Sequence, residues 1–118
     1  MERVKYIPER GDLVQLNFDP VFGHEQGGFR PALVLSPKKY NAKTRRAIVC
    51  PITSKIHNYS LEVKFDTPKV RGVIYPDQVR SIDWYARNAR YLSKISQETL
   101  DMVCYKLELL IKTDNLLF

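Results

Sequence analysis

Apolar and polar positions along the first half of the chain predict three β-strands. Residues 12–18 (DLVQLNF) alternate, with Val14, Leu16 and Phe18 on one side, which is typical of a half-buried strand. Residues 30–36 and 46–52 are almost continuously apolar, which favours strands covered on both faces. A polar stretch at 37–46 lies between these two strands, and we interpret it as a connection.

Shorter strands follow in the second half. Residues 61–65 (LEVKF) alternate, and residues 71–84 predict a short strand, a turn at Pro76–Asp77 and a further strand from about Gln78. Residues 89–95 predict one more short strand.

The apolar period then changes from two to that of a helix. Ser96 is suited to cap the N-terminus, Glu98 lies in the first turn and Lys112 near the end, as the helix dipole favours. We expect a helix over about 97–112 that lays one apolar stripe on the sheet: Leu100, Val103, Cys104, Leu107, Leu110 and Ile111.

Five or six short strands followed by one helix predict a mainly β (α+β) fold, a small curled antiparallel sheet or barrel with an appended C-terminal helix. At 118 residues, the chain is expected to form a single domain over 1–118. The loop at 20–29 is long for a hairpin, and such loops often carry function.

The composition of the chain limits the kinds of binding partner and the cellular location that we expect. The formal net charge of +6 favours a polyanionic partner. No stretch has the roughly 18 apolar residues of a membrane span, and the charged N-terminus lacks a signal-peptide core, so we expect a cytoplasmic protein. Cys50 and Cys104 lie in apolar settings, which favours buried reduced thiols, and the absence of metal-ligand spacing leads us to expect neither metal nor cofactor.

Glu25 and Arg30 flank two glycines in the long loop. The arginine fork matches phosphate oxygens and a nearby carboxylate can accept a proton, but the same pair could be a structural ion pair. His24 and His57 could perform acid–base chemistry or be exposed loop residues. The hydroxyl of Thr53 could bind a phosphate or cap the next turn.

Two segments combine basic and aromatic side chains, as proteins that bind single-stranded nucleic acid do. Trp84 and Tyr91 could equally belong to the core. The segments contain Lys38, Lys39, Tyr40, Lys43, Arg45 and Arg46, and Arg80, Trp84, Tyr85, Arg87, Arg90 and Tyr91.

The segment GDLVQLNFDPVFGHEQGGFRPALVLSP resembles the N-terminal signature of the MazF/PemK toxins of bacterial toxin–antitoxin systems. YN at 40–41, P-x-T at 51–53 and DQVRSIDW at 77–84 match in order, so the resemblance covers roughly residues 10–111. It implies an SH3-like barrel and a homodimer. It also implies a metal-independent endoribonuclease that cuts single-stranded RNA, in the first place messenger RNA, and that arrests translation and growth.

The resemblance also implies catalytic roles for Arg30 and Thr53, and links Glu25 to activity. Some relatives carry His before the RP arginine, where this chain has Phe29, so a histidine there takes no part. We expect Glu25 to be the base, Arg30 to hold the phosphate and Thr53 to add a hydrogen bond. RNA contacts are assigned to Asn41, Lys55, Gln78, Arg80 and Arg87.

Two other functions compete with this one. A non-catalytic RNA- or protein-binding module of the same barrel is disfavoured by the joint presence of the three catalytic candidates. A gyrase-poisoning toxin is disfavoured by the EQGGFRP and DQVRSIDW segments. The resemblance further implies an antitoxin with an acidic tail, which would be the chain's indirect link to DNA.

Overall fold

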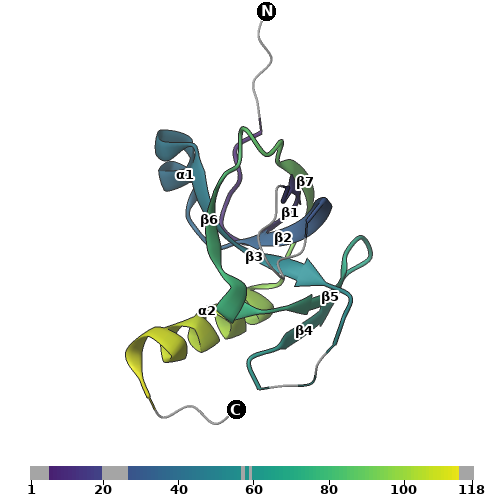
Figure 1. The fold of residues 1–118 in the computed structure, drawn as a ribbon, viewed down its shortest axis with the longest axis vertical. Helices are drawn as coiled ribbons and strands as arrows, with labels where there is room; N and C mark the ends of the chain where they lie inside the picture. The colour runs from purple at the N-terminus through teal and green to yellow at the C-terminus, as the bar shows by residue number, and fades with distance from the viewer. Residues whose placement is uncertain (1–5, 20–26, 57, 59, 115–118) are drawn as a thin grey trace, which may run out of the picture.

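The computed structural model describes residues 6–19, 27–56, 58 and 60–114, which form a curled antiparallel sheet with a C-terminal helix (Figure 1). The strands run in the order β4-β5-β3-β2-β1-β7, and β6 pairs with β3 beside this path. The expected fold class, mainly β with an appended helix, is confirmed. The strands are β1 (Asp12–Asn17), β2 (Phe29–Val34), β3 (Arg46–Thr53), β4 (Val63–Asp66), β5 (Arg71–Ile74), β6 (Arg80–Asp83) and β7 (Arg90–Lys94).

Strand β3 joins the two parts of the sheet. One of its edges pairs with β2 over Val49–Pro51, and the other pairs first with β6 over Arg46–Val49 and then with β5 at Ile52 and Thr53. Pro51 lies where that second edge passes from β6 to β5. A residue without an N–H is tolerated there because no ladder bond is required on this edge.

The hydrophobic core lies on both sides of β2, as its continuous apolar run predicts. Leu33 belongs to one buried cluster, whereas Ala32 and Val34 belong to another on the opposite side. The first cluster includes Leu100 and Val103 of the C-terminal helix. The second is built from β1, β2, β3 and β6 and includes Trp84, so this tryptophan is a core residue.

The C-terminal helix α2 (Gln97–Lys112) has the predicted bounds, and the Ser96 side chain accepts a hydrogen bond from the Thr99 N–H as a cap. Its first half packs on the sheet, whereas Ile111 is 74% exposed. The predicted apolar stripe therefore covers the sheet only over its first turns. Within the described residues, no helix is long and apolar enough to cross a membrane.

The polar connection expected at 37–46 is wrong in part, because it contains the short helix α1 (Lys38–Thr44). Its one buried residue is Asn41, and the helix ends at Arg45 in the left-handed conformation, with φ of 58°. A helix that buries a polar residue gives no apolar period for a sequence pattern to reveal. A single 3-10 turn, η1 (Pro76–Gln78), occupies the predicted turn.

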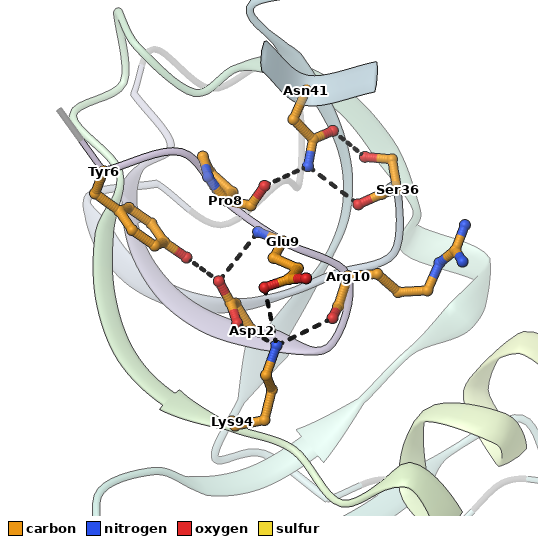
Figure 2. A network of polar contacts seen from close by, with 8 residues as sticks. All are labelled: Tyr6, Pro8, Glu9, Arg10, Asp12, Ser36, Asn41 and Lys94. Atoms are coloured by element: carbon orange, nitrogen blue, oxygen red, sulfur yellow. Dashed lines mark hydrogen bonds and ion pairs between the residues drawn. The ribbon is translucent and has the colours of Figure 1, made fainter. Parts of the chain in front are cut away.

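A buried carboxylate, Asp12, ties the segment before β1 to β7 (Figure 2). It accepts hydrogen bonds from the Tyr6 hydroxyl and the Glu9 N–H, and its other oxygen lies 2.7 Å from Nζ of Lys94. Burial and the Asp12 carboxylate both raise the pKa of Tyr6, so its hydroxyl stays protonated and remains a donor.

Both cysteines are free thiols in the first cluster or packed against it. Burial raises the pKa of Cys50 to about 12, which makes its thiolate rare at neutral pH. The free thiols and their apolar surroundings agree with the expectation of reduced cysteines.

Replacing Asp12 with Ala should lower the free energy of unfolding by about 2–4 kcal/mol, because the change removes a buried acceptor and leaves the part-buried Tyr6 hydroxyl and Glu9 N–H unpaired and Lys94 without its closest carboxylate. Chemical denaturation measures the effect. The matched control is Asp66→Ala, which breaks the exposed Asp66–Arg71 ion pair and should cost less than about 1 kcal/mol. Equal losses in the two variants would contradict the structural role of Asp12.

Candidate active site

The connection between β1 and β2 is closed at its neck by backbone contacts. The Phe18 N–H donates to the Gly28 carbonyl at 2.9 Å, and the Gly28 N–H donates to Oδ1 of Asp19 at 2.8 Å. Gly28 has φ of 76°, which a residue with a side chain adopts only with strain. These contacts fix the points where the loop leaves and re-enters the sheet.

Arg30 lies immediately after this neck, in β2 and opposite Leu16 of β1. Its side chain is half-buried, and Nε donates to the Gly27 carbonyl at 2.7 Å. Because Nε is held by the loop backbone, the guanidinium is oriented by the chain itself. A preoriented donor of this kind suits the binding of phosphate oxygens.

Thr53 is the last residue of β3, is largely buried and lies opposite Val73 of β5. Its Oγ1 accepts a hydrogen bond from the Lys55 N–H at 3.2 Å, so the hydroxyl caps the turn that follows the strand. The turn-capping interpretation is therefore correct.

The sheet register relates Arg30 to Thr53. The β2–β3 ladder ends at the pair Ala32 and Pro51. Arg30 precedes Ala32 by two residues and Thr53 follows Pro51 by two residues, so both lie just beyond the same end of this antiparallel ladder. The fold therefore brings these two candidates from separate sequence motifs to one end of the sheet.

The third catalytic candidate, Glu25, lies outside the described residues, as do His24 and His57. The described residues contain no group of three or more His, Cys, Asp or Glu side chains that could hold a metal ion.

The predicted RNA contact at Asn41 is wrong, because this residue is fully buried. Its amide donates to the carbonyls of Pro8 and Ser36 and its oxygen accepts from the Ser36 hydroxyl, as Figure 2 shows. The Asn41 carbonyl also accepts from Nε1 of Trp84. Its position in a YN motif therefore reflects packing of α1 against the sheet.

The other predicted RNA contacts differ in exposure. Lys55 and Gln78 are exposed, whereas Arg80 is half-buried with its guanidinium 5.4 Å from the centre of the Phe18 ring. Arg87 is also half-buried, and its Nη1 donates to the carbonyls of Asn17 and Asp19, each at 2.9 Å.

The sequence profile of the family described as PemK-like, MazF-like toxin of type II toxin-antitoxin system matches residues 9–111. This chain belongs to that toxin family.

Individual relatives agree with the assignment to the PemK-like, MazF-like toxins. The endoribonuclease toxin MazF of Escherichia coli K12 is 41% identical over 107 residues, which cover 91% of this chain and 96% of the relative. The endoribonuclease PemK of Escherichia coli is 33% identical over 114 residues, 92% of this chain and 86% of the relative. The crystal structure of MazF from Deinococcus radiodurans superposes with a TM-score of 0.87 at 44% identity, over 92% of this chain and all of that one.

Sequence reasoning missed how Arg87 contributes to the toxin fold. This arginine holds the start of the β1–β2 connection from the turn after β6, and its own carbonyl accepts from the Asn17 N–H. Both acceptors of its side chain are backbone carbonyls, which leave no signature in the residue pattern. The RNA contact at Arg87 stays a prediction beside this structural role.

Replacing Arg87 with Met, which keeps the aliphatic stem and removes the donors, should lower the free energy of unfolding by about 1–3 kcal/mol. The control is Arg90→Met, since Arg90 is exposed and its side chain makes no hydrogen bond within the described part of the chain; it should change stability by less than about 0.5 kcal/mol. An Arg87→Met protein of unchanged stability but weakened RNA binding would instead establish Arg87 as an RNA contact.

Proposed function

We propose that this chain is the toxin of a toxin–antitoxin system and acts as an endoribonuclease that cuts single-stranded RNA at short sequence motifs without a metal ion. Messenger RNA in the cytoplasm is the proposed target, so that cleavage stops translation and growth. The observation that carries the proposal is that Arg30 and Thr53 lie at the same end of the β2–β3 ladder in a member of the PemK-like, MazF-like toxin family.

The proposed chemistry uses the 2′-hydroxyl of the RNA itself. Its oxygen attacks the adjacent phosphorus, its proton passes to a base, and the bond from phosphorus to the 5′-oxygen breaks as that oxygen gains a proton. The products are a 2′,3′-cyclic phosphate and a 5′-hydroxyl. No metal-bound water is required in this sequence of events.

The described residues suit the electrostatic part of this reaction. Arg30 donates to phosphate oxygens from a guanidinium that is already oriented by Gly27, and Thr53 adds a neutral donor at the same end of the β2–β3 ladder. Glu25 is the proposed base, and His24 is the next candidate. Lys55, Gln78 and Arg80 are proposed to contact the RNA around this end of the ladder.

The antitoxin is proposed to occupy the same basic surface. Structural neighbours include the MazE–MazF complex of Deinococcus radiodurans, at 40% identity and a TM-score of 0.82 over 93% of this chain and all of that one. A disordered acidic tail can cover a basic groove because charge and apolar contacts offset its ordering cost. Contact with DNA would then occur only through the antitoxin.

A homodimer is proposed from an apolar groove beside α2. The groove has a volume of about 450 Å³ and is lined by residues of α1, β3 and α2 that include Tyr40, Ile48, Leu107 and Ile111. Tyr40 and Ile48 are partly exposed and Ile111 largely so. A second copy of the chain would remove this apolar surface from water, which is the usual driving force for association.

In buffer containing EDTA, the protein should cleave single-stranded RNA of mixed sequence, and Arg30→Ala should abolish cleavage while the far-UV circular dichroism stays unchanged. Thr53→Val should lose less, up to about 2.7–4 kcal/mol of transition-state stabilisation, as for other single donors to a developing charge. Gel analysis of end-labelled RNA measures both. Full activity in a folded Arg30→Ala protein would rule out the proposed site.

Glu25→Gln should reduce the single-turnover cleavage rate more than RNA affinity, because an amide cannot accept the 2′-hydroxyl proton. Rapid-quench kinetics and filter binding separate the two quantities. An unchanged rate would remove Glu25 from the role of base, and His24→Gln then becomes the variant to compare.

Ile111→Glu should weaken dimerisation about tenfold or more, because association would bury an unpaired carboxylate. Sedimentation equilibrium measures the dissociation constant. Met102→Glu is the matched control, since Met102 is a partly exposed residue of α2 that does not line the groove. Equal effects of the two changes would argue against this groove as the interface.

A further inference from the structure

Tyr75, which lies between β5 and η1, has a fully buried ring whose hydroxyl contacts two acceptors from other parts of the chain. The hydroxyl lies 2.6 Å from Oε2 of Glu62 and 2.8 Å from the carbonyl oxygen of Lys55. A phenylalanine would fill the same space without needing a partner, so the hydroxyl has a role beyond packing.

Glu62 is a buried carboxylate that organises the end of the segment between β3 and β4. Its two oxygens lie 3.2 and 3.1 Å from the Asn58 N–H, which donates to them. Nζ of Lys106, on α2, donates to the carbonyls of Ser60 and Glu62 at 2.7 and 2.9 Å. The carboxylate that contacts Tyr75 is therefore held by the loop backbone, and that backbone is held by α2.

Lys55 connects this network to Thr53. The single proton of the Tyr75 hydroxyl is shared between two acceptors, the Lys55 carbonyl at 2.8 Å and the Glu62 carboxylate at 2.6 Å. The Lys55 N–H donates to Oγ1 of Thr53. The bond to Thr53 uses a lone pair of the threonine hydroxyl, so the O–H proton does not point toward Lys55. The position of the Lys55 peptide thus restricts the directions in which Thr53 can donate.

We propose that Tyr75 and Glu62 are positioning residues for RNA cleavage, which hold the Lys55 peptide and through it orient the hydroxyl of Thr53. This inference rests on the catalytic role proposed for Thr53. The network of hydrogen bonds runs from Thr53 at the end of β3 to Lys106 on α2. The C-terminal helix therefore helps to hold the position of Thr53.

Tyr75→Phe tests the proposal because it removes one hydroxyl and keeps the ring. At saturating concentration of an oligonucleotide that contains a mapped cleavage site, the single-turnover rate should fall about tenfold, as expected for the loss of one hydrogen bond. The affinity for an uncleavable 2′-deoxy version should change much less. A wild-type rate in the Tyr75→Phe protein would overturn the proposal.

Tyr6→Phe is the matched control, since Tyr6 also donates to a buried carboxylate, Asp12, but lies at the other end of β1 from the active-site loop. It should lower stability comparably and leave the cleavage rate unchanged. An equal loss of rate in both variants would show a general effect of stability and overturn the proposal. Glu62→Gln provides a second variant of the network and should also slow cleavage without abolishing RNA binding.

A double variant distinguishes positioning through Thr53 from an independent effect. In a Thr53→Val background, Tyr75→Phe should cause little further loss, because the group that it orients is absent. Losses that multiply fully would overturn the proposal. A wild-type rate for Thr53→Val alone would refute the catalytic role of Thr53 and this inference together, whereas a slow Thr53→Val protein with a normal Tyr75→Phe protein would refute the inference alone.

Discussion

The structure depends on the hydrogen bonding of β3, the one described strand that pairs with three others. A buried strand must satisfy its backbone groups on both edges. This strand does so by changing its partner from β6 to β5 around Pro51. Because β3 runs antiparallel to β2, it ends at Thr53 near the end of the ladder where β2 begins, and Arg30 lies at that same end. The placement of both candidate residues is a consequence of the fold's central ladder.

The loops near Arg30 and Thr53 are held by hydrogen bonds between side chains and backbone groups. Arg87 holds one end of the β1–β2 connection, the Gly28 and Asp19 pair closes its neck, and Tyr75 holds the Lys55 peptide. The contacts of Arg87 and Tyr75 join segments that are 68 and 20 residues apart in the sequence, whereas the Gly28 and Asp19 contact is local. Functional loops on a small domain require this kind of support, because the strands end at the candidate residues.

Apolar periodicity predicted the strands and α2 because their buried faces are apolar. It missed α1, whose buried residue is the polar Asn41. Because a polar residue is usually exposed, Asn41 was also mistaken for an RNA contact, although its amide is used inside the protein. The proposed catalytic pair came from a family resemblance, and no pattern within either motif shows that Arg30 and Thr53 lie at the same end of the β2–β3 ladder. The roles of Arg87 and Tyr75 depend on backbone carbonyls, which every residue possesses, so sequence alone cannot identify them.

The central claim is that the substrate's own 2′-hydroxyl is the nucleophile at a site organised by Arg30. The most direct measurement uses an RNA oligonucleotide that contains a mapped cleavage site and carries a single 2′-deoxy nucleotide on the 5′ side of the scissile phosphate, assayed in EDTA. We expect the substituted RNA to bind with nearly unchanged affinity and to remain uncut, while the unmodified RNA yields a 2′,3′-cyclic phosphate and a 5′-hydroxyl. Cleavage of the substituted RNA at the same bond would rule out the 2′-hydroxyl as the nucleophile.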